Sequence, residues 1–209
     1  MISLAQVRAD TPACEHLIHF NNAGCALSPA AVTTAVTNHL RLEQELGGYE
    51  AANEAERDIA AFYPELAKLL HCDESEIAFM ESATRAWQSA LLSLDLQPGD
   101  QVLTADNEYA SNYLSLLYLS RRHGVELITI PSGDDGLIDP QRIADSITAK
   151  TRAVALTHVA SQRGDVQAIT EVGEIALENG LVFLVDACQS VGQIELNLKQ
   201  IKCDFLCGT

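Results

Sequence analysis

The alternation of short β-rich runs with helical stretches after residue 71 is the feature that most limits how this chain can fold. Strands that alternate with helices pair in parallel, and helices then cover both faces of the sheet. We therefore predict an α/β fold with a mostly parallel sheet and helices on both faces. The six expected strands cover residues 77–80, 101–104, 126–130, 152–158, 181–186 and 204–207. The helices expected between them cover residues 83–94, 109–123, 140–147 and 168–179.

The first 70 residues have a helical pattern instead. Ser28 can cap a helix that has Pro29 at its first position and runs towards the pair Gly47-Gly48. A second helix is expected over residues 49–70, because apolar residues recur on one face. We therefore expect an N-terminal helical segment, residues 1–70, followed by an α/β domain, residues 71–209.

The net charge limits the classes of binding partner, and the cysteines indicate the cellular compartment. Thirteen Lys and Arg against 29 Asp and Glu leave a net charge of −16 in 209 residues, which disfavours nucleic acid and anionic membranes as partners. The first 20 residues lack the basic start and apolar run of a signal peptide. Six scattered cysteines without a CxxC pair indicate reduced thiols, no metal site and a cytoplasmic protein.

The carboxyl ends of parallel strands are where ligands bind in such folds. The dinucleotide fingerprint GxGxxG and the Walker motif are both missing. Ser82-Ala83-Thr84 lies where a strand turns into a helix, so free main-chain N–H groups and the Thr84 hydroxyl could bind phosphate. The plainer interpretation is that Ser82 only caps the helix.

Two further strand ends carry candidate ligand-binding side chains. Asp186 follows an apolar strand, and its carboxylate can hold a ring nitrogen in the protonated state. Gln189 is close enough in sequence to reach the same ligand. Tyr109 begins a helix and could stack on a ring. The plainer alternatives are that Asp186 caps the following turn and that Tyr109 is a packing residue.

Five segments together carry a resemblance to a known family. In chain order they are Phe20-Asn21-Asn22-Ala23-Gly24, Phe79-Met80-Glu81-Ser82-Ala83-Thr84, Glu108-Tyr109-Ala110-Ser111-Asn112, His158-Val159-Ala160-Ser161-Gln162-Arg163-Gly164 and Val185-Asp186-Ala187-Cys188-Gln189-Ser190. They resemble the class V aminotransferase family of pyridoxal-phosphate (PLP) enzymes, which has the fold-type I architecture. That family includes cysteine desulfurases, selenocysteine lyases, isopenicillin N epimerase and C–S lyases. The sequence around Tyr109 and Asp186 looks closer to the epimerase and C–S lyase branch.

The resemblance implies roles around the phosphate of PLP. Ala83 and Thr84 match the phosphate-binding turn of the family, and Thr209 matches a further phosphate contact. Ser161 falls where desulfurases usually have an Asn that contacts the cofactor.

The resemblance also implies roles around the ring. Tyr109 matches the residue that stacks on the pyridine ring, which is often His in relatives. Asp186 matches the carboxylate that pairs with the pyridine nitrogen. Gln189 matches a residue near the ring hydroxyl.

The family's Schiff-base Lys follows the strand that matches residues 204–207, so the resemblance places it beyond Thr209. The chain would then be the N-terminal portion of such a protein, without the C-terminal small domain and without a catalytic residue of its own. The four lysines present are Lys68, Lys150, Lys199 and Lys202.

Two functions remain open at this point. The resemblance implies a cytoplasmic, homodimeric PLP enzyme that acts on a small amino acid as a C–S lyase, desulfurase or epimerase. The alternative is a non-catalytic remnant, or a folded partner module, that binds PLP at most non-covalently. A nucleotide-binding doubly wound domain has only the fold class in its favour.

Overall fold

A computed structural model describes residues 3–209, which form two compact units, residues up to Glu65 and residues 66–209. The first unit consists of α1 (Leu4–Ala9), a 3-10 turn η1 (Pro12–Glu15), α2 (Ala30–Leu46), α3 (Gly48–Glu54), α4 (Glu56–Ala60) and the start of α5 (Phe62–Leu70). Of its described residues only Thr11 and Ala51 are buried. The domain boundary expected at residue 70 stays a proposal.

The second unit is built on five parallel strands. They are β1 (Gln101–Ala105), β2 (Glu126–Ile130), β3 (Thr151–Thr157), β4 (Val182–Asp186) and β5 (Phe205–Cys207). Their order in the sheet is β2-β1-β3-β4-β5, and every neighbouring pair is parallel. The order reverses between β1 and β3, because the chain leaves β1 towards one edge and returns on its other side. Such a reversal opens a crevice at the carboxyl ends of the two strands.

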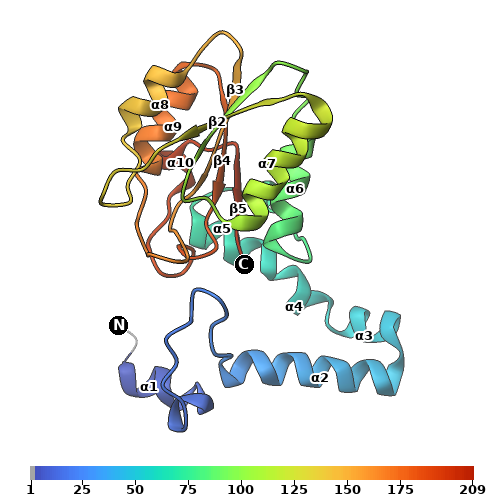
Figure 1. Cartoon of the computed structure of the whole chain (residues 1–209). Coiled ribbons are helices and arrows are strands. Elements are labelled where there is room, and N and C mark those ends of the chain that lie inside the picture. Colours follow the sequence, from blue (N-terminus) through green and yellow to red (C-terminus); the bar gives the residue numbers. More distant parts are fainter. Residues whose placement is uncertain (1–2) are drawn as a thin grey trace. The chain divides into compact units, whose positions relative to one another are not determined.

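Helices cover both faces of this sheet (Figure 1). The remaining elements are η2 (Glu74–Glu76), α6 (Ala83–Ser93), α7 (Ala110–His123), α8 (Pro140–Ser146), α9 (Ile169–Glu178) and α10 (Leu198–Ile201). One buried cluster joins Trp87 and Leu116, from α6 and α7, to Ala155 of β3. Another joins Val172 of α9 to Leu156 of β3. Successive side chains of one strand thus point to opposite faces of the sheet and pack under different helices. The expected α/β fold is confirmed.

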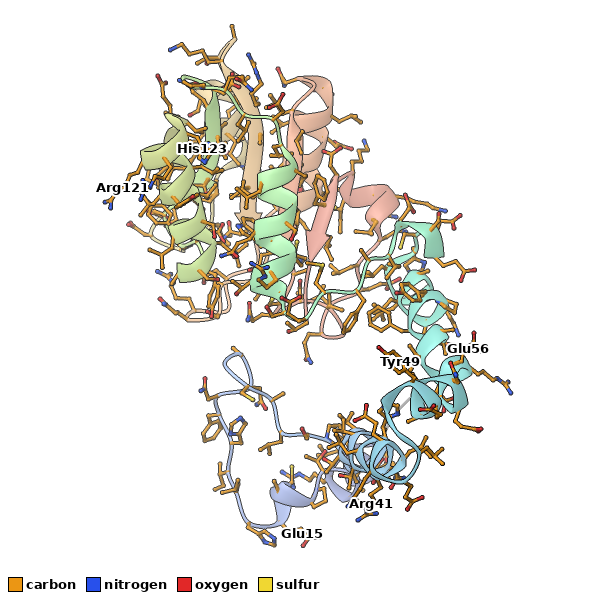
Figure 2. The ribbon with its side chains drawn as sticks, turned by 90° about the vertical axis from the view of Figure 1, so that its right-hand side faces the viewer. Glu15, Arg41, Tyr49, Glu56, Arg121 and His123 are labelled. Carbon is orange, nitrogen blue, oxygen red and sulfur yellow. The ribbon has the colours of Figure 1, made fainter. Side chains whose placement is uncertain are left out.

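The helix ends of the second unit follow ordinary capping rules. Asp139 caps α8 by accepting a hydrogen bond from the Gln141 N–H (2.9 Å). Gly124 ends α7 in the left-handed conformation (φ 69°), which a residue without Cβ adopts freely. The last turn of α7 is basic, which suits the negative end of a helix dipole. Figure 2 shows the Arg121 side chain of that turn extending away from the sheet.

Three expected elements differ from those observed. The stretch 77–80 is not a strand, because it forms no ladder with any described strand. The helix expected over 49–70 is divided into α3, α4 and α5. Pro64 explains the break before α5: in the first turn of a new helix its missing N–H has no partner to lose.

The third difference lies at the start of α2. Pro29 takes the N-cap position, with ψ 151°, and Ser28 does not cap the helix. The Ala30 N–H, at the start of the helix, instead donates to the Asp10 carbonyl (2.7 Å).

Gly173 offers a test of the packing between α9 and α10. A Cβ at this position would lie 1.8 Å from the Ile201 carbonyl oxygen, a backbone atom that cannot rotate away. We expect Gly173→Ala to lower the free energy of unfolding by about 2 kcal/mol or more, because one helix must move. Chemical denaturation measures the loss. Glu178→Ala, at an exposed position of the same helix, is the control, and equal stability of the two variants would contradict the observed packing.

Candidate functional site

Asp186 ends β4 and is a buried polar side chain at the carboxyl edge of the sheet. Only 4% of it is exposed. Its Oδ2 accepts a hydrogen bond from Asn112 Nδ2 (2.6 Å), and its Oδ1 accepts one from the Cys188 N–H (3.0 Å). The second bond makes Asp186 a cap of the following turn, as the plainer interpretation held. The first bond reaches across to α7 and ties the end of β4 to the start of that helix.

Glu108 is a second carboxyl group at this edge, and the sequence reasoning gave it no role. Its Oε2 accepts a hydrogen bond from the Thr157 N–H (2.9 Å), and its Oε1 accepts one from Asn112 Nδ2 (3.1 Å). The Thr157 hydroxyl also contacts Oε1. Burial raises the pKa of Glu108, and the charge of Asp186 acts in the same direction, whereas the hydrogen bonds lower it.

Tyr109 occupies the N-cap position of α7 and is 46% exposed, so it is not a residue of the buried core. Its main-chain N–H donates to Glu108 Oε1 (3.0 Å) and lies 3.4 Å from Thr157 Oγ1. The loop that carries the Tyr109 ring is therefore attached to the end of β3 through Glu108.

The turn before α6 lies beside the start of α7. Ser82 caps α6 by accepting a hydrogen bond from the Arg85 N–H (3.3 Å), as the plainer interpretation held. Thr84 Oγ1 lies 3.2 Å from Ser111 Oγ, and Ser111 directly precedes Asn112. Ala83 and Thr84 are both partly exposed. Two helix starts, each with main-chain N–H groups and a positive dipole end, thus lie close to the Asp186 carboxylate.

The turn after β4 holds two more of the expected residues. The Cys188 thiol is hydrogen-bonded to the side chains of Asp186 and of Thr209, so Thr209 lies at the same edge. Gln189 is partly buried in this turn. Ser161 lies in the loop after β3, and no hydrogen bond in the described part of the chain joins its side chain to the others. The structure therefore brings Thr84, Tyr109, Asp186 and Thr209 together, and cofactor binding by any of these residues stays a prediction.

The cysteines near the site are protonated thiols. All six cysteines are free. Burial, together with the charge of Asp186, raises the pKa of Cys188 and of Cys207 to about 12. Burial raises the pKa of Cys203 to about 12 as well. Since the thiolate is the reactive form, these three groups are poor nucleophiles at neutral pH.

His158 directly follows β3 but belongs to a different part of the fold. Its main-chain N–H donates to the Asp186 carbonyl (2.8 Å), while its side chain lines a cavity of about 430 Å³ beside α9 and α10. Burial lowers the pKa of the imidazole, so the ring is neutral at physiological pH. The structure gives this side chain no contact with the Asp186 carboxylate.

Comparison with known proteins identifies the family. A family model described as aminotransferase class-V matches residues 18–208. The chain belongs to the class-V aminotransferase family. A probable cysteine desulfurase from Methanothermobacter thermautotrophicus is 30% identical over 202 residues, which are 95% of this chain and 50% of that protein. A mitosomal cysteine desulfurase from Encephalitozoon cuniculi is 30% identical over 186 residues, 87% of this chain and 41% of that protein.

Solved structures of similar fold agree with this family. The apo structure of a cysteine desulfurase from Thermococcus onnurineus has a TM-score of 0.88 and 26% identity, and the match covers 100% of this chain and 53% of that one. A complex of the cystine C-S lyase C-DES with cysteine persulfide has a TM-score of 0.86 at 24% identity, covering 95% of this chain and 54% of that one. This class-V chain therefore spans about half the length of the relatives it matches.

Residues 3–209 contain neither a membrane-spanning helix nor a metal-binding cluster. None of the helices formed by residues 3–209 is both long and apolar enough to cross a bilayer. The same residues contain no group of three or more His, Cys, Asp or Glu side chains placed to hold a metal ion.

The raised thiol pKa values predict a labelling pattern. At pH 8, a thiol of pKa about 12 is roughly one part in ten thousand thiolate. We expect iodoacetamide to modify the exposed Cys14 and Cys25 well before Cys188, as followed by peptide mass spectrometry. The same reaction in guanidinium chloride, where all six thiols are accessible, is the control. Alkylation of Cys188 at the rate of Cys25 in the folded chain would contradict the assigned burial.

Proposed function

We propose that this chain forms the PLP-binding half of a class-V enzyme that cleaves the C–S bond of a small amino acid, as a cysteine desulfurase or C–S lyase does. The observation that carries the proposal is the buried Asp186 carboxylate, held by Asn112 beside two helix starts. The names of the relatives, most of them cysteine desulfurases, support the same class of substrate. Because the chain covers about half of each relative, the reaction is proposed for the whole protein.

The donor set at the edge of the sheet fits PLP chemically. A fixed carboxylate suits a protonated pyridine nitrogen, because an opposite charge favours the protonated form. Main-chain N–H groups and a hydroxyl at the start of α6 suit a phosphate. The half-exposed Tyr109 ring offers a surface for stacking. When bound, PLP supplies an electron sink for bond cleavage at the amino acid.

We assign the residues of this chain to binding and orientation. Asp186 would hold the ring nitrogen protonated, and Tyr109 would fix the plane of the ring. Gln189 would bind the ring hydroxyl. The phosphate would bind to Ala83 and Thr84 at the start of α6, with Thr209 at the same end of the sheet. Ser161 would add a further cofactor contact from the loop after β3.

The positions of the lysines favour reversible, non-covalent binding of PLP by these 209 residues. A non-catalytic protein that binds PLP is therefore the second candidate function. Lys150 Nζ contacts Glu126 (3.4 Å) at the start of β2, the opposite edge of the sheet. Lys202 Nζ contacts Glu174 of α9 (3.1 Å). None of the four lysines is hydrogen-bonded to the Asp186 network in the part of the chain that the structure describes.

Three further properties are part of the proposal. A class-V enzyme of this kind would be homodimeric in its full-length form, would be cytoplasmic, and would act on a small-molecule amino acid. The net charge of −16 argues against nucleic acid or an anionic membrane as a partner.

Asp186→Asn tests the proposal. Loss of a hydrogen bond to a charged group costs about 1.5–3 kcal/mol, so we expect PLP to bind roughly 10- to 100-fold more weakly to the variant. Equilibrium dialysis with PLP absorbance measures the dissociation constant. The matched control is Asp134→Asn, which removes an exposed charge elsewhere. Unchanged affinity in Asp186→Asn would remove this carboxylate from the site, and failure of the wild-type chain to bind PLP would overturn the proposed function.

Borohydride treatment of the same samples tests whether a lysine of these 209 residues reaches the cofactor. We expect the 209-residue chain to release its PLP after borohydride treatment and dialysis, because no lysine contacts the network. A stable adduct, located by peptide mass spectrometry, would instead identify a lysine within reach of the cofactor.

A further inference from the structure

Asn112 has an arrangement that the proposed function does not yet use. It is 2% exposed and lies in the first turn of α7. A side-chain amide nitrogen carries two hydrogens. Asn112 Nδ2 lies 2.6 Å from Asp186 Oδ2 and 3.1 Å from Glu108 Oε1. One amide therefore donates to two carboxyl groups at once, in a place from which water is excluded.

The first of these bonds fixes the Asp186 carboxylate. With Asn112 on Oδ2 and the Cys188 N–H on Oδ1, both oxygens accept a hydrogen bond, and the carboxyl group cannot turn without breaking one of them. A charge-assisted bond of 2.6 Å is at the short end for a nitrogen donor. Asn112 thus sets the direction in which Asp186 presents its charge.

Glu108 fixes a different group. Its carboxyl joins the main-chain N–H groups of Tyr109 and Thr157, and so it spans from the segment after β1 to the last residue of β3. These are the two strands between which the order of the sheet reverses. The backbone that carries the Tyr109 ring is therefore held to the end of β3 by Glu108.

Several hydrogen bonds and few other titratable groups surround the two carboxyl groups. The charged or titratable groups around the pair are the thiols of Cys188 and Cys207, both largely protonated at neutral pH, together with the pair itself. The Thr157 hydroxyl donates to the same Glu108 oxygen that accepts from Asn112 and from the Tyr109 N–H. Burial and the charge of Asp186 raise the pKa of Glu108, while these hydrogen bonds lower it.

We propose that Glu108 and Asn112 are positioning residues of the cofactor site, Asn112 for the Asp186 carboxylate and Glu108 for the Tyr109 ring. This inference rests on the proposed function where it concerns PLP. The hydrogen-bond network itself does not depend on the cofactor, so it can be tested separately.

Double-mutant cycles on PLP affinity test the two assignments in the 209-residue chain. We expect Asn112→Leu, which keeps the volume of the side chain, to weaken PLP binding about tenfold, the loss typical of one charge-assisted bond. In an Asp186→Asn background the same substitution should have little further effect. Glu108→Gln should weaken binding as well, and its effect should vanish in a Tyr109→Ala background. Asn179→Leu, which alters an exposed amide at the end of α9, is the control and should bind PLP as the wild type does.

Additive losses in both cycles would overturn the inference, since they would indicate a general structural role. If Asn112→Leu does not fold, Asn112→Ser replaces it, because serine is small enough to be accommodated and too short to join both carboxyl groups.

A measurement without PLP keeps this inference separate from the proposed function. In nitrogen-15 NMR spectra of the apo chain, we expect the Asn112 side-chain amide protons to exchange slowly with water. Glu108→Gln and Asp186→Asn should each shift these resonances, whereas Asp134→Asn should not. Unshifted resonances in both variants would overturn the network, whether or not PLP binds. Shifted resonances together with absent PLP binding would support the network and overturn only the proposed function.

Discussion

The parallel pairing of all five strands is the constraint on which the rest of this structure depends. Parallel strands need helical connections, and those helices bury both faces of the sheet. Pairing in one direction also brings every strand's carboxyl end to the same edge. Residues that are 49 positions apart, Glu108 and Thr157, can form hydrogen bonds only because β1 and β3 end side by side. The position of the candidate site thus follows from the topology alone, and the side chains determine only its chemistry.

The regular part of the fold could be predicted because local patterns encode it. The stretches that became β1 to β5 are short apolar runs. Asp139 marks a helix start through its side-chain oxygen, and Gly124 marks a helix end because it lacks a Cβ. The stretch 77–80 has a similar composition, yet a strand exists only where a neighbour supplies hydrogen bonds. The break before α5 is encoded in Pro64, a signal to which the apolar periodicity of residues 49–70 is blind.

The candidate site could be predicted only in part. Asp186 and Thr84 stand at strand and helix boundaries, where the topology alone draws attention to polar residues. Glu108 and Asn112 carried a weaker signal, their spacing of four residues across a helix start, which is common on protein surfaces. What makes this pair distinctive is burial against β3 and β4, and burial of that kind depends on contacts between distant parts of the chain. Ser161 was proposed from family resemblance alone, and no local pattern in its loop supports or opposes that role.

Trp87, a core residue of α6, is the chain's single tryptophan. With 1% of its surface exposed, the indole is shielded from water, and it lies one helical turn beyond Thr84. A lone, buried indole at that position gives the chain one tryptophan emission with one origin. Its emission reports on the helix that begins at the proposed phosphate turn, and energy transfer from it would be sensitive to any coloured molecule bound there. The same residue that fills the core therefore makes the site observable without a label.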